Sequence, residues 1–398
     1  MKPPKMDYTM RAQRLSIPKG RRVILTSDVH GRLSWLKGLL KKVSFSPEDY
    51  LIIAGDILEK GEESLSTLRY LMELERTGHV HIVYGNVDAR VIEYLETPEL
   101  FYSRYCRMMK NWGYSVYSEM LKEQGLKLEE TGERTPQALE MEGLLKEEPG
   151  RLEEAAVQEA WSRICAAYER ELAYIQGLPA VIDAGAFLVT HAGLPTEDYG
   201  SLSAEQVRHM VNWKSFQDEE LYFSRYVFVG HWPVTIYERE KMDSSPLINR
   251  KKRIVSLDGG CAVKRDGQLN AMILPDIDAR EFKIESFDDF PRARVQEDRE
   301  GRAETFHIRW KERFVERIRR EEEGSLVRVL CTGREHWIPE PYLWEDEDDG
   351  RMCCSDYTDA VLPLRAGDEV SVLGSYRRGY LVRKDGVQGW YDGRLTMI

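Results

Sequence analysis

RVILTSDVHG, residues 22–31, is a short apolar run that ends abruptly in polar residues. Val23, Ile24 and Leu25 follow one another without a polar interruption, which is typical of a strand buried on both faces of a sheet. Asp28 and His30 come directly after this run, two positions apart, so both side chains can turn to one side and bind one ion. The stretch therefore predicts an α/β fold with a polar site at the tip of a buried strand.

Four further apolar runs have the same form, because each is strand-like and ends in a residue that can bind a metal. They are YLIIAGD ending at Asp56, HIVYGN at Asn86, AFLVTH at His191 and YVFVGH at His231. Between the first three of the five runs, leucines at helical spacing predict helices within 31–45 and 63–74. Such strand–helix–strand units make neighbouring strands parallel, so we expect Asp28, Asp56 and Asn86 to emerge at one edge of the sheet.

The rest of the chain predicts an insertion and a second domain. We expect a first domain over 1–280, in which the charged, helix-forming segment at about 91–178 is a helical insertion over or beside the site. RIVSLDGGCAVKRDGQLNAMIL, residues 253–274, is expected to form a hairpin that extends the second half of the sheet. Residues 281–325 are predicted to be a charged linker or long helix, and 326–398 a β-rich module, because short β-prone segments there alternate with glycine turns.

Composition excludes several classes of protein. The 398 residues carry 57 basic and 68 acidic side chains, and a net charge of -11 argues against non-specific binding of nucleic acid backbones. The six cysteines are scattered and form no CxxC pair, which favours a reducing compartment over a disulfide framework. Without a signal peptide or an apolar run long enough to span a bilayer, we expect a cytoplasmic protein with no membrane partner.

The six strand-tip side chains have a chemistry in common. Carboxylate, amide oxygen and imidazole donors together suit Mn, Fe or Zn, and we expect two divalent ions, with Mn the first choice. Two ions roughly 3.5 to 4 Å apart can share a hydroxide that attacks phosphorus in line, while they clamp the phosphoryl group. The donors therefore predict phosphoester hydrolysis without a covalent intermediate.

The ordered motifs resemble those of a known family. SDVHG (27–31), GDILEKG (55–61), GNVD (85–88), THAGL (190–194) and VGHWP (229–233) are similar to the calcineurin-like metallophosphoesterases. LDGGC (257–261) resembles the end of the branch that contains diadenosine tetraphosphatases and bacterial serine/threonine phosphatases. The resemblance covers about residues 20–280 apart from the insertion, and it implies a four-layer α/β/β/α sandwich.

Carried over to this sequence, the resemblance implies two overlapping ligand sets. Asp28, His30 and Asp56 would hold the first ion. Asp56 would bridge the two ions and act in catalysis. It would hold the second ion together with Asn86, His191 and His231. At the C-terminus, Trp390 and Tyr391 resemble the end of bacterial SH3-like modules, where they either line a groove for a peptide partner or close a small barrel's core.

The sequence departs from the family's pattern in two motifs. Glu59 and Lys60 replace an Asp-Arg pair, so a point charge replaces a forked arginine contact to phosphate. Glu59 is either a partner within the catalytic site or a loop charge, and Lys60 either binds substrate phosphate or is solvated. Val87 replaces a histidine and cannot transfer a proton, which shifts expectation toward a diester or phosphoanhydride.

Three further residues are candidates. His209 is the candidate substitute proton donor, and Arg225 either meets phosphate or is a surface arginine. Asp258 either accepts a hydrogen bond from a ligand histidine or is a turn residue.

Together these features predict a cytoplasmic, dinuclear phosphatase or phosphodiesterase acting on a phosphorylated small molecule, a nucleotide or a phosphoprotein. The alternative is a catalytically weak or inactive metal-binding scaffold that acts through the insertion and the SH3-like module.

Overall fold

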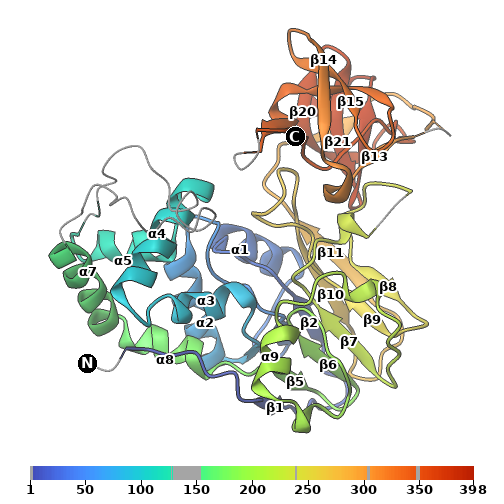
Figure 1. Ribbon diagram of the computed structural model, residues 1–398. Coiled ribbons are helices and arrows are strands. Elements are labelled where there is room, and N and C mark those ends of the chain that lie inside the picture. The colour runs from blue at the N-terminus through green and yellow to red at the C-terminus, as the bar shows by residue number, and fades with distance from the viewer. Residues whose placement is uncertain (1–2, 127, 129–153, 238–239, 303–304, 347–349) are drawn as a thin grey trace. The chain divides into compact units, whose positions relative to one another are not determined.

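Figure 1 shows the computed structural model of the chain, which describes residues 3–126, 128, 154–237, 240–302, 305–346 and 350–398. These residues form a mixed α/β fold in two compact units. The first unit comprises 1–231, 248–255 and 271–283, and the second comprises 232–247, 256–270 and 284–398. The part of the predicted insertion at 127 and 129–153 lies outside the described residues.

The predicted parallel strands are present. β2 (Val23–Thr26), β3 (Tyr50–Ile53) and β4 (His79–Ile82) pair in parallel, and Thr26, Ile53 and Ile82 lie level with one another. They belong to a five-stranded sheet in the order β11-β10-β2-β3-β4. Because the three strands end at the same level, the residues that follow them emerge at one edge, as predicted.

The helices between these strands follow from leucine spacing. α1 (Leu33–Lys42) buries Leu33, Leu36 and Leu39, and α2 (Ser64–Thr77) buries three leucines at the same spacing. Each helix connects two parallel strands, so each apolar stripe is covered while the opposite face stays polar. Lys41 and Lys42 lie in the last turn of α1, where cations interact favourably with the helix dipole.

A six-stranded sheet has the order β1-β5-β6-β7-β9-β8. Its strands are β1 (Ala12–Arg14), β5 (Val181–Asp183), β6 (Phe187–Thr190), β7 (Tyr226–Val229), β8 (Leu247–Asn249) and β9 (Ile254–Ser256). β6 and β7 are parallel, with Val189 opposite Phe228. The histidines that follow these two strands therefore also leave their sheet at one edge.

The predicted hairpin over 253–274 is wrong. β9 belongs to the six-stranded sheet, whereas β10 (Leu269–Leu274) belongs to the five-stranded sheet and pairs antiparallel with β2. All six residues of β10 are buried, and the strand lies between β2 and β11 (Lys283–Phe287). Apolar periodicity identified both strands, but it does not say which sheet receives each one.

The described part of the insertion is helical, as its composition predicts. α3 (Asn86–Glu93) leads into it, and its helices are α4 (Pro98–Trp112), α5 (Val116–Glu123), α7 (Glu154–Ala167) and α8 (Glu169–Gly177). Thr97 caps α4 by accepting from the Leu100 amide, Pro98 occupies its first turn, and Gly113 ends it in a left-handed conformation. A further helix, α9 (Ala204–Met210), lies between β6 and β7 in the chain.

The charged segment 281–325 is not the predicted long helix over its described residues. It contains part of β11, then β12 (Arg292–Val295), β13 (His307–Ile308) and β14 (Val315–Arg320). In β12, exposed arginines alternate with the buried Ala293 and Val295, and this period of two is the strand pattern. β12 pairs with β20 (Glu369–Tyr376) and β23 (Leu395–Met397), so the segment belongs to the C-terminal sheet.

The described C-terminal residues are rich in strands, as predicted. A five-stranded sheet has the order β22-β21-β20-β12-β23, and a three-stranded sheet has the order β14-β15-β16. The remaining strands are β15 (Gly324–Val329), β16 (Glu335–Pro339), β17 (Leu343–Glu345), β18 (Met352–Cys354), β19 (Tyr357–Thr358), β21 (Gly379–Lys384) and β22 (Val387–Tyr391). Tyr391 is fully buried beside Ala293 and Val295, so it contributes to a core and not to a groove.

Short 3₁₀ turns complete the described elements: η1 (Tyr199–Ser201), η2 (Phe216–Asp218), η3 (Val234–Ile236), η4 (Trp310–Glu312) and η5 (Glu340–Tyr342). Among the described residues, no helix has both the length and the apolar character that crossing a bilayer requires.

Candidate metal centre

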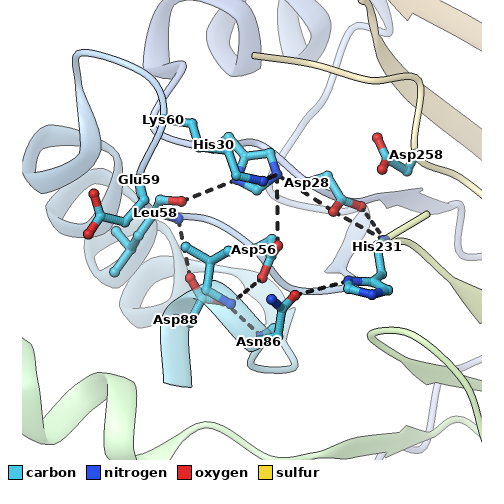
Figure 2. A network of polar contacts seen from close by, with 12 residues as sticks. Asp28, His30, Asp56, Leu58, Glu59, Lys60, Asn86, Asp88, His231 and Asp258 are labelled. Atoms are coloured by element: carbon cyan, nitrogen blue, oxygen red, sulfur yellow. Dashed lines mark hydrogen bonds and ion pairs between the residues drawn. The ribbon is translucent and has the colours of Figure 1, made fainter. Parts of the chain in front are cut away.

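The six predicted donors converge, although they come from five separate stretches of chain. Figure 2 labels all of them except His191. Ligand atoms of Asp28, His30 and Asp56 lie within 4.8 Å of one another, and so do those of Asp56, His191 and His231. Asp56 belongs to both groups. The donors follow β2, β3, β6 and β7, and the amide donor, Asn86, opens α3 after β4.

Asn86 joins the second group through its side-chain oxygen. Its Oδ1 lies 3.0 Å from His191 Nε2 and 3.0 Å from His231 Nδ1. Asp56 Oδ1 lies 3.4 Å from the same His191 nitrogen, while Asp56 Oδ2 lies 3.8 Å from His30 Nε2. The two carboxylate oxygens of Asp56 therefore face different donor groups, which is the arrangement that a bridging ligand requires.

Backbone carbonyls orient two of the histidine rings. His191 Nδ1 lies 2.7 Å from the Ala54 oxygen, and His30 Nδ1 lies 3.3 Å from the Leu58 oxygen. A carbonyl oxygen only accepts, so in each ring Nδ1 carries the hydrogen and the Nε2 lone pair faces the cluster. This is the tautomer that a metal-binding histidine needs, held by a partner behind the ring.

Burial and charge put these groups in the protonation state that suits cation binding. Burial, together with the charge of Lys60, lowers the pKa of His30 to about 3, and burial beside His191 lowers that of His231 to about 3. For Asp56, burial opposes ionisation, but electrostatic interactions with His191, His30 and Lys60 outweigh it and lower the pKa. At neutral pH the site presents neutral imidazoles and an ionised carboxylate.

The backbone at four of the donors is in the left-handed region. The φ angles are 52° at Asp28, 49° at His30, 51° at Asp56 and 70° at His231. Each such non-glycine residue costs on the order of 1–3 kcal/mol, and such residues cluster at functional sites. Two main-chain hydrogen bonds connect the strained loops. The Asp28 amide donates to the backbone carbonyl of Gly55 (3.0 Å), and the His30 amide donates to the backbone carbonyl of Asp56 (2.9 Å).

Asp88 is a site residue to which the sequence assigned no role. One of its oxygens accepts from the Ile57 and Leu58 amides (3.0 and 3.2 Å), and the other accepts from the Gly85 amide (2.8 Å). Burial, and then the negative charge of Asp56, raise its pKa to about 7. The available signal was its place at the third position of α3, where a carboxylate caps a helix by accepting from backbone amides.

Lys60 reaches the centre, but Glu59 turns away from it (Figure 2). Lys60 Nζ lies 3.1 Å from His30 Nε2. Glu59 is fully buried, and its carboxylate accepts from the Val116 amide (3.1 Å) and from Ser115 Oγ (3.3 Å) at the start of α5. Glu59 therefore anchors the second motif to the insertion, and these contacts do not support the catalytic role predicted for it.

Arg225 is not brought to the donors. It precedes β7, whereas His231 follows that strand, so the two lie at opposite ends. Its Nη1 lies 2.7 Å from Asp183 Oδ1 and its Nε lies 3.1 Å from Glu197 Oε2. The predicted phosphate contact is therefore replaced by two carboxylate partners at the other end of the strand.

Two other predicted residues are also placed. His209 is exposed on α9, with its ring 4.8 Å from that of Trp213, and it does not belong to either donor group. Asp258 is buried in the second compact unit, where it accepts from the Gly260 amide (2.7 Å) across a tight turn. Its turn role is present, and its partnership with a ligand histidine stays a prediction.

Two sheets that deliver carboxylate, amide and imidazole donors to one buried cluster are features of an α/β metallophosphoesterase. The profile of the calcineurin-like phosphoesterases matches residues 21–252, and the chain belongs to this family.

Individual relatives match over shorter stretches. The symmetrical bis(5'-nucleosyl)-tetraphosphatase of Pectobacterium atrosepticum is 44% identical over 69 residues, which are 17% of this chain and 24% of the relative. Serine/threonine-protein phosphatase 2 of Salmonella typhimurium is 29% identical over 123 residues, 31% of this chain and 53% of the relative. The solved structure of a protein serine/threonine phosphatase from Saccharomyces cerevisiae aligns with 72% of this chain and 84% of its own, at 12% identity and a TM-score of 0.39.

Gly55 tests how tightly the site is packed. Its φ is 82°, and an added Cβ would lie 2.7 Å from both the Gly85 amide nitrogen and His191 Nδ1. Gly185 has a similar φ of 76°, but a Cβ added there would meet no other residue within 4 Å. We expect Gly185→Ala to lower the free energy of unfolding by about 1–2 kcal/mol, and Gly55→Ala by about 1–3 kcal/mol more, with weaker metal binding. Urea unfolding measures the free energy of unfolding, and metal titration measures the affinity for the ion. An equal decrease in the free energy of unfolding of the two variants would contradict the described packing.

Proposed function

We propose that the chain is a phosphoesterase with two divalent ions, most simply Mn²⁺, bound by the six converging donors. The observation that carries this proposal is Asp56, whose two oxygens face two separate donor groups. Asp28, His30 and Asp56 would hold one ion, and Asp56, Asn86, His191 and His231 the other. The mix of oxygen and imidazole donors fits Mn, Fe or Zn.

The protein's own groups prepare the site for this chemistry. Bound ions would supply an activated water nucleophile and offset the charge of the phosphoryl group. Carbonyls behind His30 and His191 fix the ring nitrogens, and burial of the donors strengthens their electrostatic interactions. Lys60 would bind a phosphate oxygen, since its ammonium already lies at the centre.

At Val87 the site lacks a side chain that could protonate the leaving group. Its amide donates to Asp56 Oδ1 (2.9 Å), so the main chain at this position still orients the bridging carboxylate. Its side chain has no proton to give to a leaving group. We therefore propose substrates whose leaving group is a stable anion, such as diesters of acidic alcohols or phosphoanhydrides.

The wider proposal concerns fold, compartment and partners. The two sheets would be the inner layers of a four-layer α/β/β/α sandwich, and the C-terminal strands would form an SH3-like module with a peptide partner. The names of the relatives support a nucleotide or a phosphoprotein as substrate. The six free cysteines favour the cytoplasm as the compartment.

Replacing the shared carboxylate tests the proposed activity. With Mn²⁺, the unmodified chain should hydrolyse bis(p-nitrophenyl) phosphate, and Asp56→Asn should lower turnover by more than about 100-fold because both ions lose a ligand. Arg225→Ala is the control, and its turnover should stay within about twofold since Arg225 pairs with carboxylates away from the donors. Mn²⁺ bound by the unmodified chain without hydrolysis of diesters, monoesters or anhydrides would contradict the enzyme and favour the scaffold.

Restoring a proton donor tests the role assigned to Val87. In Val87→His, hydrolysis of an alkyl phosphodiester should rise, by up to about 100-fold, while hydrolysis of the p-nitrophenyl diester should change little, because only the poor leaving group needs protonation. Val87→Phe adds volume without a transferable proton and should raise neither rate. A histidine variant that accelerates both esters equally, or neither, would contradict the assignment.

A further inference from the structure

Trp112, the last residue of α4, is an exposed aromatic side chain close to the candidate phosphate site. Its side chain belongs to the insertion and is 38% exposed. Lys60 Nζ lies 5.7 Å from the centre of its ring and 3.1 Å from His30 Nε2. One ammonium group therefore contacts both a proposed metal ligand and this indole.

Hydrogen bonds between the insertion and the second motif hold the segment that follows Trp112. The Val116 amide donates to the Glu59 carboxylate (3.1 Å), and the Leu65 amide donates to Glu119 Oε1 (2.9 Å). These bonds span both sides of the loop that carries Lys60. Trp112, which directly precedes this anchored segment, is held beside the loop instead of being carried on a free helix end.

Trp112 lies at the end of α4 and is partly exposed. Gly113 adopts a left-handed conformation with a φ of 66°, and its amide donates to the Met109 oxygen (2.8 Å). The helix therefore ends directly after Trp112. A partly exposed indole beside a cation is a surface for a flat ring that carries negative charge nearby.

Metal binding would redirect Lys60 toward substrate. His30 Nδ1 faces the Leu58 carbonyl, so Nε2 is the nitrogen whose lone pair can serve either the Lys60 ammonium or an ion. With an ion at Nε2, the ammonium would turn from His30 to a phosphate oxygen. A phosphate bound by Lys60 would then lie close to the indole, since Nζ is 5.7 Å from the ring centre.

We propose that Trp112 stacks on a flat aromatic group of the substrate, and that the substrate is accordingly a nucleoside phosphate ester or anhydride. This inference rests on the proposed function, because it assumes a phosphate held at the metal centre. A phosphoserine side chain offers no ring to stack. A quaternary ammonium group would be attracted to the indole but repelled by Lys60. In a nucleotide, the base would stack on the indole and the phosphate would pair with the Lys60 ammonium.

A pair of ligands that differ in the base isolates the contribution of Trp112. Calorimetric titration of the Mn²⁺-loaded full chain with adenosine 5'-monophosphate and with ribose 5-phosphate gives the two affinities. Trp112→Ala should weaken binding of the nucleotide about tenfold and leave ribose 5-phosphate unchanged, since stacking on an aromatic side chain has about that effect. Trp112→Phe should retain most of the nucleotide affinity, because a ring remains.

Trp310→Ala is the matched control, because Trp310 is also 38% exposed and also lies against a cation, Arg313, at 4.4 Å. It should change neither affinity. Loss of nucleotide affinity confined to Trp112→Ala, with unchanged thermal unfolding, supports the inference. Equal affinity of Trp112→Ala and the unmodified chain for the nucleotide overturns it while the phosphate site stands, and failure of both ligands to bind the unmodified chain overturns the proposed phosphate site and the inference together.

Discussion

The site depends on one carboxylate that must face two donor groups at once. Asp56 follows β3, has a left-handed φ of 51°, and accepts from the Val87 amide at 2.9 Å. Its two oxygens lie toward His30 on one side and His191 on the other. Because these histidines come from different sheets, the bridging position exists only when both sheets bring their strand ends to the same place.

Gathering so many polar groups inside a protein is unfavourable unless they are compensated. Asp28, Asp56 and Asp88 are all buried within this small region, and the charge of Asp56 helps to raise the pKa of Asp88. Buried carboxylates are stabilised by hydrogen bonds or by cations. Asp88 accepts from three backbone amides. Asp28 and Asp56 accept from the His231 and Val87 amides and also face histidine nitrogens that can bind metal. Bound cations would therefore stabilise the folded chain as well as serve its chemistry.

The sequence predicted much of this centre, because two simple rules apply to it. Uninterrupted apolar runs marked the buried strands, and parallel pairing of β2, β3 and β4 placed their following residues at one edge. The hairpin over 253–274 was wrong because periodicity does not select a strand's partner. The charged linker or long helix over 281–325 was wrong because its described residues include strands, and the alternating charges of β12 lie on the exposed face of one of them. Contacts made by side chains distant in sequence could not be predicted. Glu59 binds the insertion at Val116, and Arg225 pairs with Asp183, without any motif that marks either pair.

Crystals grown with Mn²⁺ and measured at the manganese absorption edge test the central claim most directly. The account predicts two anomalous peaks roughly 3.5 to 4 Å apart, with a carboxylate oxygen of Asp56 within bonding distance of each. A single peak, or two peaks of which only one is bound by Asp56, would contradict a centre built around a shared carboxylate.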